Sequence, residues 1–385
     1  MPTPTKTTDV AIIGGGIIGA SIAYHLAARG VKNIVVFERE EALGMGSTAK
    51  CAGGVRLQFS TTVNVEMSRL SIAAFERFED EMGEIIDFER NGYLFVLTTE
   101  RDLEMFRANA AKQRELGVPV EVLTPEQARD IVPVLHIDDL VGATFCGADG
   151  IANPHAIVQG YAKNARRLGV EIMRSSEVTS MEVAGRRVRA LKTQSDRWEM
   201  DWVVNAAGPW ARGVGAMAGV EVPVDPVKRQ YFITKPMDWV PDRFPLLIDW
   251  GSGVYMHNVS GALLIGESDR NEPTSFNQQV DWEFLAKVTE HAIARIPRVE
   301  EAEIQSTAAG LYEVSPDHNA ILGSVPELEN FVCANGFSGH GMQHAPAVGL
   351  VISELIVDGA SSSIDIAPYA IERFQKAVLP ELNVI

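Results

Sequence analysis

The sequence predicts a mixed α/β fold with two interleaved domains. A glycine-rich turn at residues 14–19 lies between a short apolar run, 10–13, and a segment with helical periodicity. A second apolar run, 33–37, ends in Glu38 and completes a strand–helix–strand unit. Between 222 and 266, apolar alternation with Gly and Pro punctuation is typical of antiparallel strands. We therefore expect a Rossmann-like domain joined to a second domain built on a mainly antiparallel sheet.

Helical periodicity and short apolar runs continue along the rest of the chain. Thr124 followed by Pro125 is a helix-start signal, and Gly30 and Gly169 follow the last turn of a helical stretch. The helices expected are 17–29, 63–82, 100–116, 124–131, 154–168, 283–296 and 342–357. The strands expected are 90–97, 170–174, 178–183, 188–193, 201–205 and 331–334.

The composition indicates which kinds of partner and which cellular compartment to expect. The 385 residues carry a formal net charge of −17, which disfavours nucleic acid and anionic lipid as partners. Cys51, Cys146 and Cys333 are far apart and odd in number, which favours a reducing compartment over a disulfide framework. No run approaches the ~18 apolar residues of a membrane span, and the polar residues 1–8 lack the apolar core of a signal peptide. We expect a cytoplasmic protein that acts on a small molecule.

The glycine turn has the pattern G-x-G-x-x-G and lies where a strand passes into a helix. Gly14 permits the tight turn, Gly16 lets the backbone approach a pyrophosphate, and Gly19 lets helix and strand pack closely. The N–H groups at the start of the helix, around Ile17 and Ile18, offer partial positive charge to phosphates. The turn therefore predicts a dinucleotide site, without separating FAD from NAD.

Two further features favour a long cofactor. Glu38 lies 24 residues after Gly14, so its carboxylate can accept from both ribose hydroxyls and would repel a 2′-phosphate. A loop of small and hydroxylic residues, 44–56, comes soon after Arg39 and would add a second cradle beside the same phosphates. A nicotinamide enzyme has no need of that second cradle, whereas an extended dinucleotide buried along its length does.

These segments resemble the D-amino-acid oxidase superfamily of FAD enzymes, and within it the glycine oxidase and sarcosine oxidase branch with its β-type subunits and dye-linked proline dehydrogenases. The segments 204–210, 310–323 and 336–342 resemble the later cofactor-binding blocks of that family, so the likeness runs from Val10 to about Gly349. It implies FAD bound without a covalent link. The implied cofactor-binding residues are Gly14, Gly16, Ile17, Ile18, Gly19, Glu38, Arg39, Gly46, Ser47, Thr48, Ala52, Gly53, Val178, Ala207, Gly208, Trp210, Gly310, Gly336, Gly339, His340, Gly341 and Met342.

The resemblance also implies a division into domains. Residues 1–85, 145–220 and 320–385 are expected to form a discontinuous FAD-binding domain. Residues 86–144 and 221–319 are expected to form the substrate-binding domain.

The implied chemistry is hydride transfer from the carbon next to an amine nitrogen to flavin N5, followed by hydrolysis of the imine. The glycines of 336–342 precede a helix whose N-terminus would stabilise the negative charge of reduced flavin. Tyr255 matches a tyrosine that touches the substrate carboxylate in the family, and Arg56 could supply cationic help. His340 either faces the active site or hydrogen-bonds its own loop. Tyr312 completes the set of candidate catalytic residues.

Departures from the family pattern bear on the substrate and on flavin attachment. Tyr312 stands where the glycine oxidase branch has a carboxylate-clamping arginine. Phe59 and Gln343 stand where monomeric sarcosine oxidases have an arginine and a lysine. These losses leave room for a larger amine or a cyclic imino acid. Lys50 and Gly310 stand where relatives have the histidine or cysteine that links flavin covalently, so a non-covalent flavin is expected.

Three other interpretations stay open at this point. The chain could be a β-type subunit that passes electrons to a partner subunit, and it could form a homo-oligomer. It could be a nicotinamide-dependent dehydrogenase, although the second phosphate loop argues against that. It could also be a catalytically inactive FAD-binding assembly protein, which the missing clamp residues suggest.

Overall fold

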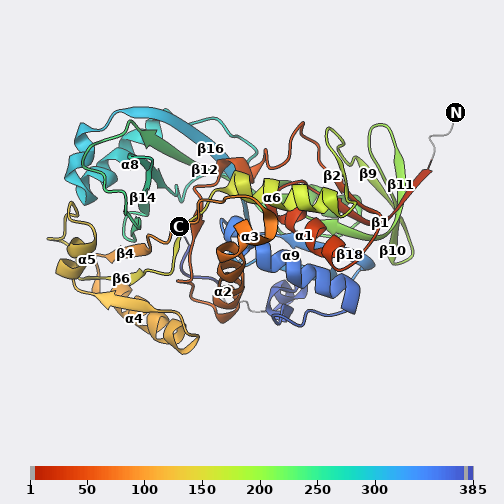
Figure 1. Cartoon of the computed structure of the whole chain (residues 1–385), viewed down its shortest axis with the longest axis horizontal. Coiled ribbons are helices and arrows are strands. Elements are labelled where there is room, and N and C mark those ends of the chain that lie inside the picture. Colours follow the sequence, from red (N-terminus) through yellow and green to blue (C-terminus); the bar gives the residue numbers. More distant parts are fainter. Residues whose placement is uncertain (1–4, 377–379, 385) are drawn as a thin grey trace.

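The computed structural model describes residues 5–376 and 380–384, and this part of the chain folds into two eight-stranded sheets that lie side by side (Figure 1). The first sheet runs in the order β17 (Ile321–Val325), β18 (Leu328–Asn335), β11 (Arg197–Asn205), β1 (Thr5–Ile13), β2 (Ile34–Phe37) and β8 (Glu171–Met173), with β10 (Arg187–Lys192) paired to β11 and β9 (Ser180–Ala184) paired to β10. The second runs β16 (Ile304–Val314), β12 (Asp225–Thr234), β15 (Ala262–Glu267), β14 (Val254–Val259), β13 (Leu246–Asp249), β4 (Tyr93–Leu97), β6 (Gly142–Cys146) and β5 (Val120–Leu123).

The centre of the first sheet is parallel, and its register decides where three loops emerge. Ile13 of β1 pairs with Phe37 of β2 on one side and with Asn205 of β11 on the other. The three strands therefore end at the same edge, with their carboxyl ends in line. In open parallel sheets this edge is where ligands bind.

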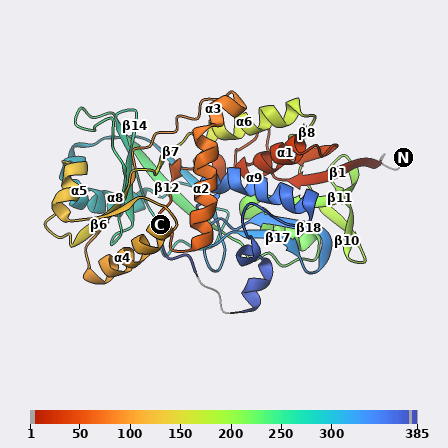
Figure 2. The ribbon, with the colours of Figure 1, turned by 60° about the horizontal axis from the view of Figure 1, so that its bottom comes forward.

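Helices cover one face of the first sheet, as expected when parallel strands are joined by crossovers. Figure 2 shows α1 (Ile17–Ala28), α6 (Pro154–Arg167) and α9 (Gly341–Asp358) along this sheet, with α2 (Thr62–Glu76) and α3 (Phe78–Met82) towards the second sheet. Val10, Ile12 and Val36 of the strands and Ile22 and Leu26 of α1 belong to this buried layer. Ala11 and Ile13 of β1 point to the other face of the sheet, where they belong to a second core that includes residues of α7 (Ala211–Met217).

The second sheet is almost wholly antiparallel and carries helices on both faces. Val288 and Ala292 of α8 (Trp282–Arg295) pack on one face, where α5 (Pro125–Ile131) also lies. Leu103 and Phe106 of α4 (Glu100–Glu115) pack on the other face. The remaining elements are β3 (Gly54–Val55) paired with β7 (Gly150–Ile151), and 3₁₀ turns at Ser47–Lys50, Gly208–Trp210, Pro297–Glu301, Ala367–Tyr369 and Ile371–Gln375.

The predicted fold class, a mixed α/β fold with a dinucleotide-type sheet and a mainly antiparallel partner, is confirmed. The helix expected over 63–82 is wrong as one element, because the chain breaks at Arg77 into α2 and α3. The strand expected at 201–205 is the end of the longer β11, which pairs with β1 from Arg197 onward. The bounds of the two predicted domains stay a prediction.

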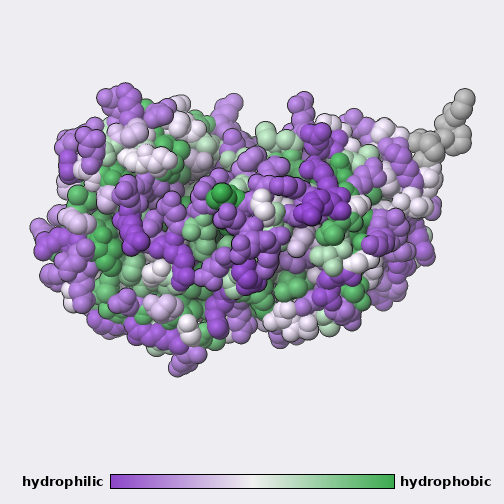
Figure 3. All heavy atoms as spheres, in the orientation of Figure 1, coloured by the Kyte–Doolittle hydropathy of each residue, from purple (hydrophilic) through white to green (hydrophobic). Residues whose placement is uncertain are grey.

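The surface in Figure 3 is mostly hydrophilic, with apolar side chains scattered between charged ones. Among the described residues no helix combines the length and apolar character that crossing a bilayer requires.

The end of the chain is fastened between the two sheets by a buried carboxylate. Glu381 accepts hydrogen bonds from the backbone N–H groups of Ser60 and Thr61, at 2.7 and 3.1 Å, and from both of their hydroxyls. Asn64 of α2 donates to the same carboxylate at 3.0 Å. The negative charge thus lies at the N-terminus of α2, where free N–H groups and the helix dipole favour it.

We expect Glu381→Gln to lower the free energy of unfolding by ~1–3 kcal/mol, because an amide cannot accept from all of these donors. Denaturant titration followed by circular dichroism measures this. Glu372→Gln, at an exposed position on a nearby turn, is the matched control. Equal stability of the two variants would contradict the fastening role.

Candidate cofactor and substrate site

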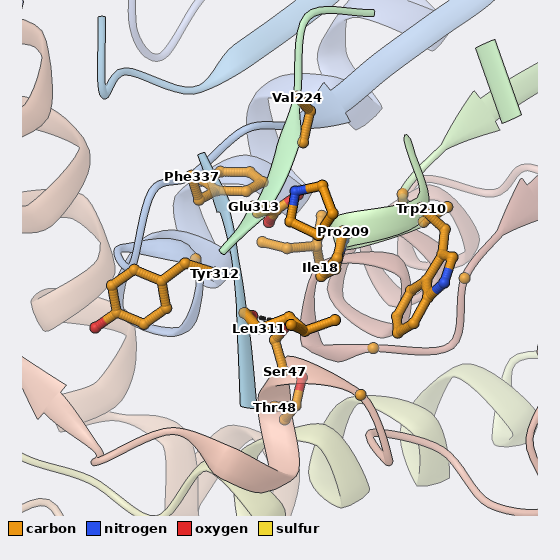
Figure 4. A pocket seen from close by; sticks show the side chains of 18 of the residues that line it. Ile18, Ser47, Thr48, Pro209, Trp210, Val224, Leu311, Tyr312, Glu313 and Phe337 are labelled. Atoms are coloured by element: carbon orange, nitrogen blue, oxygen red, sulfur yellow. Dashed lines mark hydrogen bonds between the residues drawn. The ribbon is translucent and has the colours of Figure 1, made fainter. Parts of the chain in front are cut away.

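A cavity of about 810 Å³ lies at the carboxyl edge of the parallel strands and continues to the second sheet. Its volume is near the upper end of the ~300–1,000 Å³ of small-molecule sites. Figure 4 shows Tyr312 at the left of the view, Trp210 at the right, and Ser47 and Thr48 below and between them. Ile13 and Phe37 of the first sheet and Tyr231 and Tyr255 of the second also line the cavity, so both sheets contribute to its walls.

The glycine turn is shaped by contacts that only glycine permits. Gly14 has φ +112°, and a Cβ placed on it would lie 2.2 Å from the carbonyl oxygen of Ala206. A Cβ on Gly19 would lie 1.9 Å from the carbonyl oxygen of Gly14. The turn therefore sits directly against the loop that follows β11, and α1 begins close to β1.

The cavity side of the turn is left open. A Cβ on Gly16 would meet no protein atom closer than 3.6 Å, so the space beside it is available to a ligand. The backbone N–H of Gly15 donates to Glu38 and that of Ile17 to Thr48, whereas those of Gly16 and Ile18 have no hydrogen-bond partner among the described residues. Two free donors at a helix N-terminus are what a phosphate group requires.

Backbone N–H groups hold the carboxylate of Glu38 in a fixed position. One carboxylate oxygen accepts from Gly15 N–H and the other from Glu40 N–H, both at 2.8 Å. Glu38 also lines the cavity. This arrangement fits the ribose hydroxyls of an adenosine group.

Aromatic side chains close the outer wall near Glu38. The guanidinium of Arg39 lies 3.6 Å from the ring centre of Trp210, and Phe276 stacks on Trp210 at 5.6 Å and 16°. Between the two sheets, the hydroxyl of Ser47 donates to the carbonyl of Leu311 at 2.6 Å, the interaction dashed in Figure 4. This bond ties the second predicted cradle to strand β16.

The opposite end of the cavity, which we call the tyrosine chamber, is lined by three aromatic side chains and one arginine from the second sheet: Tyr231, Tyr255, Tyr312 and Arg229. Two glycines make room for its rings, since a Cβ on Gly266 would meet Tyr255 at 2.3 Å and one on Gly339 would meet Tyr312 at 2.5 Å. Burial raises the pKa of Tyr255 well above its usual value, and burial likewise raises the pKa of Tyr312. Both phenols are therefore neutral hydrogen-bond donors at neutral pH.

Arg56 and His340 lie next to the cavity rather than among the described residues that line it. Arg56 donates to the carbonyl oxygens of Gln58 and Asn383 and contacts Nε2 of His340 at 3.2 Å. Burial, followed by the neighbouring Arg56, lowers the pKa of His340 well below its usual value, so the ring is neutral. These two residues support the wall behind the chamber, and direct contact with substrate stays a prediction.

Glu313 is a half-buried acid that the sequence did not single out. It follows Tyr312 on β16, lines the cavity, and accepts from the N–H of Gly336 at 3.0 Å. Burial raises the pKa of this carboxyl to about 8, partly opposed by the N–H groups of Gly336 and Phe337. It is therefore largely protonated at neutral pH and can donate a hydrogen bond into the cavity.

The predicted site residues divide into two groups. Those that line the cavity are Gly14, Gly16, Ile17, Ile18, Glu38, Arg39, Gly46, Ser47, Thr48, Ala52, Val178, Ala207, Gly208, Trp210, Tyr255, Gly310, Tyr312, Gly339, Gly341 and Met342. Those that do not are Gly19, Gly53, Gly336, Arg56 and His340. Gly53 and Gly336 instead serve backbone turns at φ +83° and +72°.

Sequence reasoning missed Arg229, Tyr231, Phe276 and Glu313, which also line the cavity. The alternation of β12 held a signal, because Arg229 and Tyr231 share the face of that strand that is not fully buried. Phe276 lies in an irregular segment, and no pattern in the sequence marked it as a site residue.

Residues 9–355 match the profile of the family described as FAD dependent oxidoreductase, abbreviated DAO. The chain belongs to this family. The expected resemblance, the enzyme class and FAD as cofactor are thereby confirmed, and the nicotinamide alternative is set aside. The open face at Gly16, the anchored Glu38 and the length of the cavity fit FAD.

Relatives of this FAD-dependent oxidoreductase cover nearly its whole length. It is 31% identical to FAD-dependent oxidoreductase domain-containing protein 1 of Xenopus laevis, over 99% of this chain and 86% of that protein. It is 30% identical to mitochondrial sarcosine dehydrogenase of Homo sapiens over 98% of this chain, which spans only 42% of that longer protein. The crystal structure of L-proline dehydrogenase from P. horikoshii matches with 32% identity and a TM-score of 0.91, over 98% of this chain and 100% of that chain.

Two glycine substitutions distinguish the role of the turn in folding from its role in binding the ligand. We expect Gly16→Ala to leave the thermal unfolding of the cofactor-free protein near wild type and to weaken FAD binding at least ~10-fold, because the added methyl group occupies space open to the ligand. Gly14→Ala should instead destabilise the fold, because its Cβ meets Ala206. Calorimetric FAD titration measures the first effect, and unchanged affinity in Gly16→Ala would contradict the assignment.

The raised pKa of Glu313 predicts that the stability of the folded protein depends on pH. Because the folded pKa is about 8 and an unfolded carboxyl titrates near ~4.3, the folded state holds this proton more tightly, and its stabilising effect is lost as pH rises through that window. We expect the melting temperature of cofactor-free Glu313→Gln to rise relative to wild type between about pH 5 and pH 8.5. Glu329→Gln, at an exposed position, is the control and should show a constant difference.

Proposed function

We propose that this chain oxidises a small amino acid or secondary amine at the carbon next to nitrogen, of the sarcosine, glycine, proline or N-alkyl amino-acid type. The observation that carries the proposal is the tyrosine chamber at the far end of the cavity from the glycine turn, a space lined by hydrogen-bond donors. Similarity to proteins named sarcosine dehydrogenase and L-proline dehydrogenase supports it.

Bound FAD supplies the hydride acceptor, and the chain supplies position and electrostatics. The glycine turn and Glu38 hold the dinucleotide end, and α9 begins at Gly341 on the cavity wall with its positive end towards the bound group. Tyr255 and Tyr312 donate hydrogen bonds to the substrate and exclude water from the chamber. The amine enters neutral, so no side chain has to remove a proton from it.

The shape of the chamber favours a substrate larger than glycine. Tyr312 replaces the expected clamp arginine, and its ring packs over Gly339 rather than reaching across the cavity. A cyclic imino acid or an N-alkyl amino acid fills such an aromatic chamber better than glycine does.

We also propose that the flavin is held without a covalent bond. A Cβ on Gly310 would meet Cβ of Lys50 at 2.4 Å, so the two positions that carry flavin-linking residues in relatives are adjacent here and offer neither histidine nor cysteine. Cys51 lines the cavity, but burial raises the pKa of its thiol and keeps it in the unreactive protonated form.

An anaerobic substrate screen tests the function. We expect the purified protein to be yellow, to release its flavin on acid denaturation, and to bleach with at least one of glycine, sarcosine, L- or D-proline, hydroxyproline or an N-alkyl amino acid. Absorbance of the flavin follows the reaction. A yellow protein that none of these reduces would instead favour a catalytically inactive FAD-binding assembly protein.

The same preparation distinguishes the electron acceptor. A true oxidase consumes oxygen at the rate at which substrate reduces it. A β-type subunit reduces an artificial dye but consumes little oxygen, because a partner subunit normally takes its electrons.

A further inference from the structure

Arg229 is a cation in the tyrosine chamber that has no acidic partner within the described chain. Its one hydrogen bond runs from Nη1 to the neighbouring carbonyl of Lys228 at 2.9 Å. Its Nε is buried and has no hydrogen-bond partner, and no described carboxylate lies within 4.0 Å of its guanidinium. The side chain lines the cavity, so the space in front of it belongs to the ligand.

Two other enclosed cations, Lys228 and Arg295, have carboxylate partners, and the buried Arg56 donates to the carbonyl oxygens of Gln58 and Asn383. Lys228, the preceding residue, forms an ion pair with Glu272 at 3.4 Å on the opposite face of the strand. Arg295 is held between Asp139 and Asp249 at 2.9 and 2.8 Å. A chain with 51 acidic residues and 34 basic ones can easily place a carboxylate beside a cation. An enclosed guanidinium left without one costs free energy that an anionic ligand would offset.

The position of Arg229 within the chamber fits a substrate group. Its guanidinium carbon lies 5.3 Å from the ring centre of Tyr312. Arg229, Tyr255 and Tyr312 all line the same cavity. On β12, Arg229 is opposite Gly310 of β16, which is covered by the side chain of Lys50.

We propose that Arg229 binds the carboxylate of the substrate, and that the enzyme therefore acts on α-amino acids rather than on amines that lack an acid group. This inference rests on the proposed oxidation of an amino acid or amine in the chamber. Arg229 takes over the role of the clamp arginine that Tyr312 replaces, from a different strand. Guanidinium–carboxylate pairs are among the strongest hydrogen-bonded contacts in proteins, so Arg229 would set specificity.

The test uses the FAD-loaded protein and pairs of ligands that differ only in the carboxylate. L-Proline and pyrrolidine are one pair, and sarcosine and dimethylamine are another. In wild type we expect the acid of a pair to reduce the flavin at far lower concentration than the amine. In Arg229→Gln the apparent Kd of the acid should rise at least ~30-fold, with little change for the amine. Arg229→Lys should retain part of the preference, because it keeps the charge without the planar fork.

Two further measurements test the same contact, the first of them without turnover. A carboxylate that cannot be oxidised, pyrrole-2-carboxylate, should perturb the flavin spectrum of wild type but not that of Arg229→Gln at the same concentration. Added guanidinium ion should restore part of the activity of Arg229→Ala. Arg298→Gln removes one positive charge from an exposed site in the same domain and is the matched control.

The outcomes separate this inference from the proposed function. Reduction of wild type and Arg229→Gln at the same acid concentration would overturn the role of Arg229 and leave the function standing. Loss of bound FAD in Arg229→Gln, measured as flavin content, would show that the cofactor is its partner and would also overturn the inference. Failure of every acid and amine to reduce the wild type would overturn the proposed function itself.

Discussion

The site depends first on one constraint, the register of three parallel strands. Ile13, Phe37 and Asn205 are side by side, so the turns after β1, β2 and β11 leave the sheet at one edge. The turn after β1 and the turn after β11 touch each other, because the carbonyl oxygen of Ala206 leaves no room for a side chain on Gly14. The glycine turn, Glu38 and the loop before Trp210 are therefore brought together by backbone pairing alone.

The second constraint is the docking of the antiparallel sheet against that edge. Strands β12, β14 and β16 supply Arg229, Tyr255 and Tyr312, while Ser47 on the first domain bonds directly to Leu311. A cofactor that spans the cavity touches both sheets, so its binding and the relative position of the sheets are linked. The C-terminal residues reinforce this junction, because Glu381 and Asn383 reach α2 and Arg56 from the end of the chain.

The chamber combines neutral phenols with the guanidinium of Arg229, which has no carboxylate partner among the described residues. Buried tyrosines remain protonated and donate hydrogen bonds without adding charge. Arg229 adds a positive charge to the cavity wall of a chain whose formal net charge is −17. Supporting groups such as neutral His340 and Arg56 lie behind the wall and hold its shape.

The sequence by itself determined the dinucleotide end of the site and the family. Gly14, Gly16, Gly19 and Glu38 are local signals, since a tight turn, a close approach and a strand-end acid each require a particular residue at a fixed spacing. The α/β class followed from the same periodicity. What only the tertiary structure decided was the substrate end, where Arg229, Tyr255 and Glu313 come from strands distant in sequence and meet through sheet pairing. Whether a charged side chain is paired depends on its neighbours in space, and no local pattern records them.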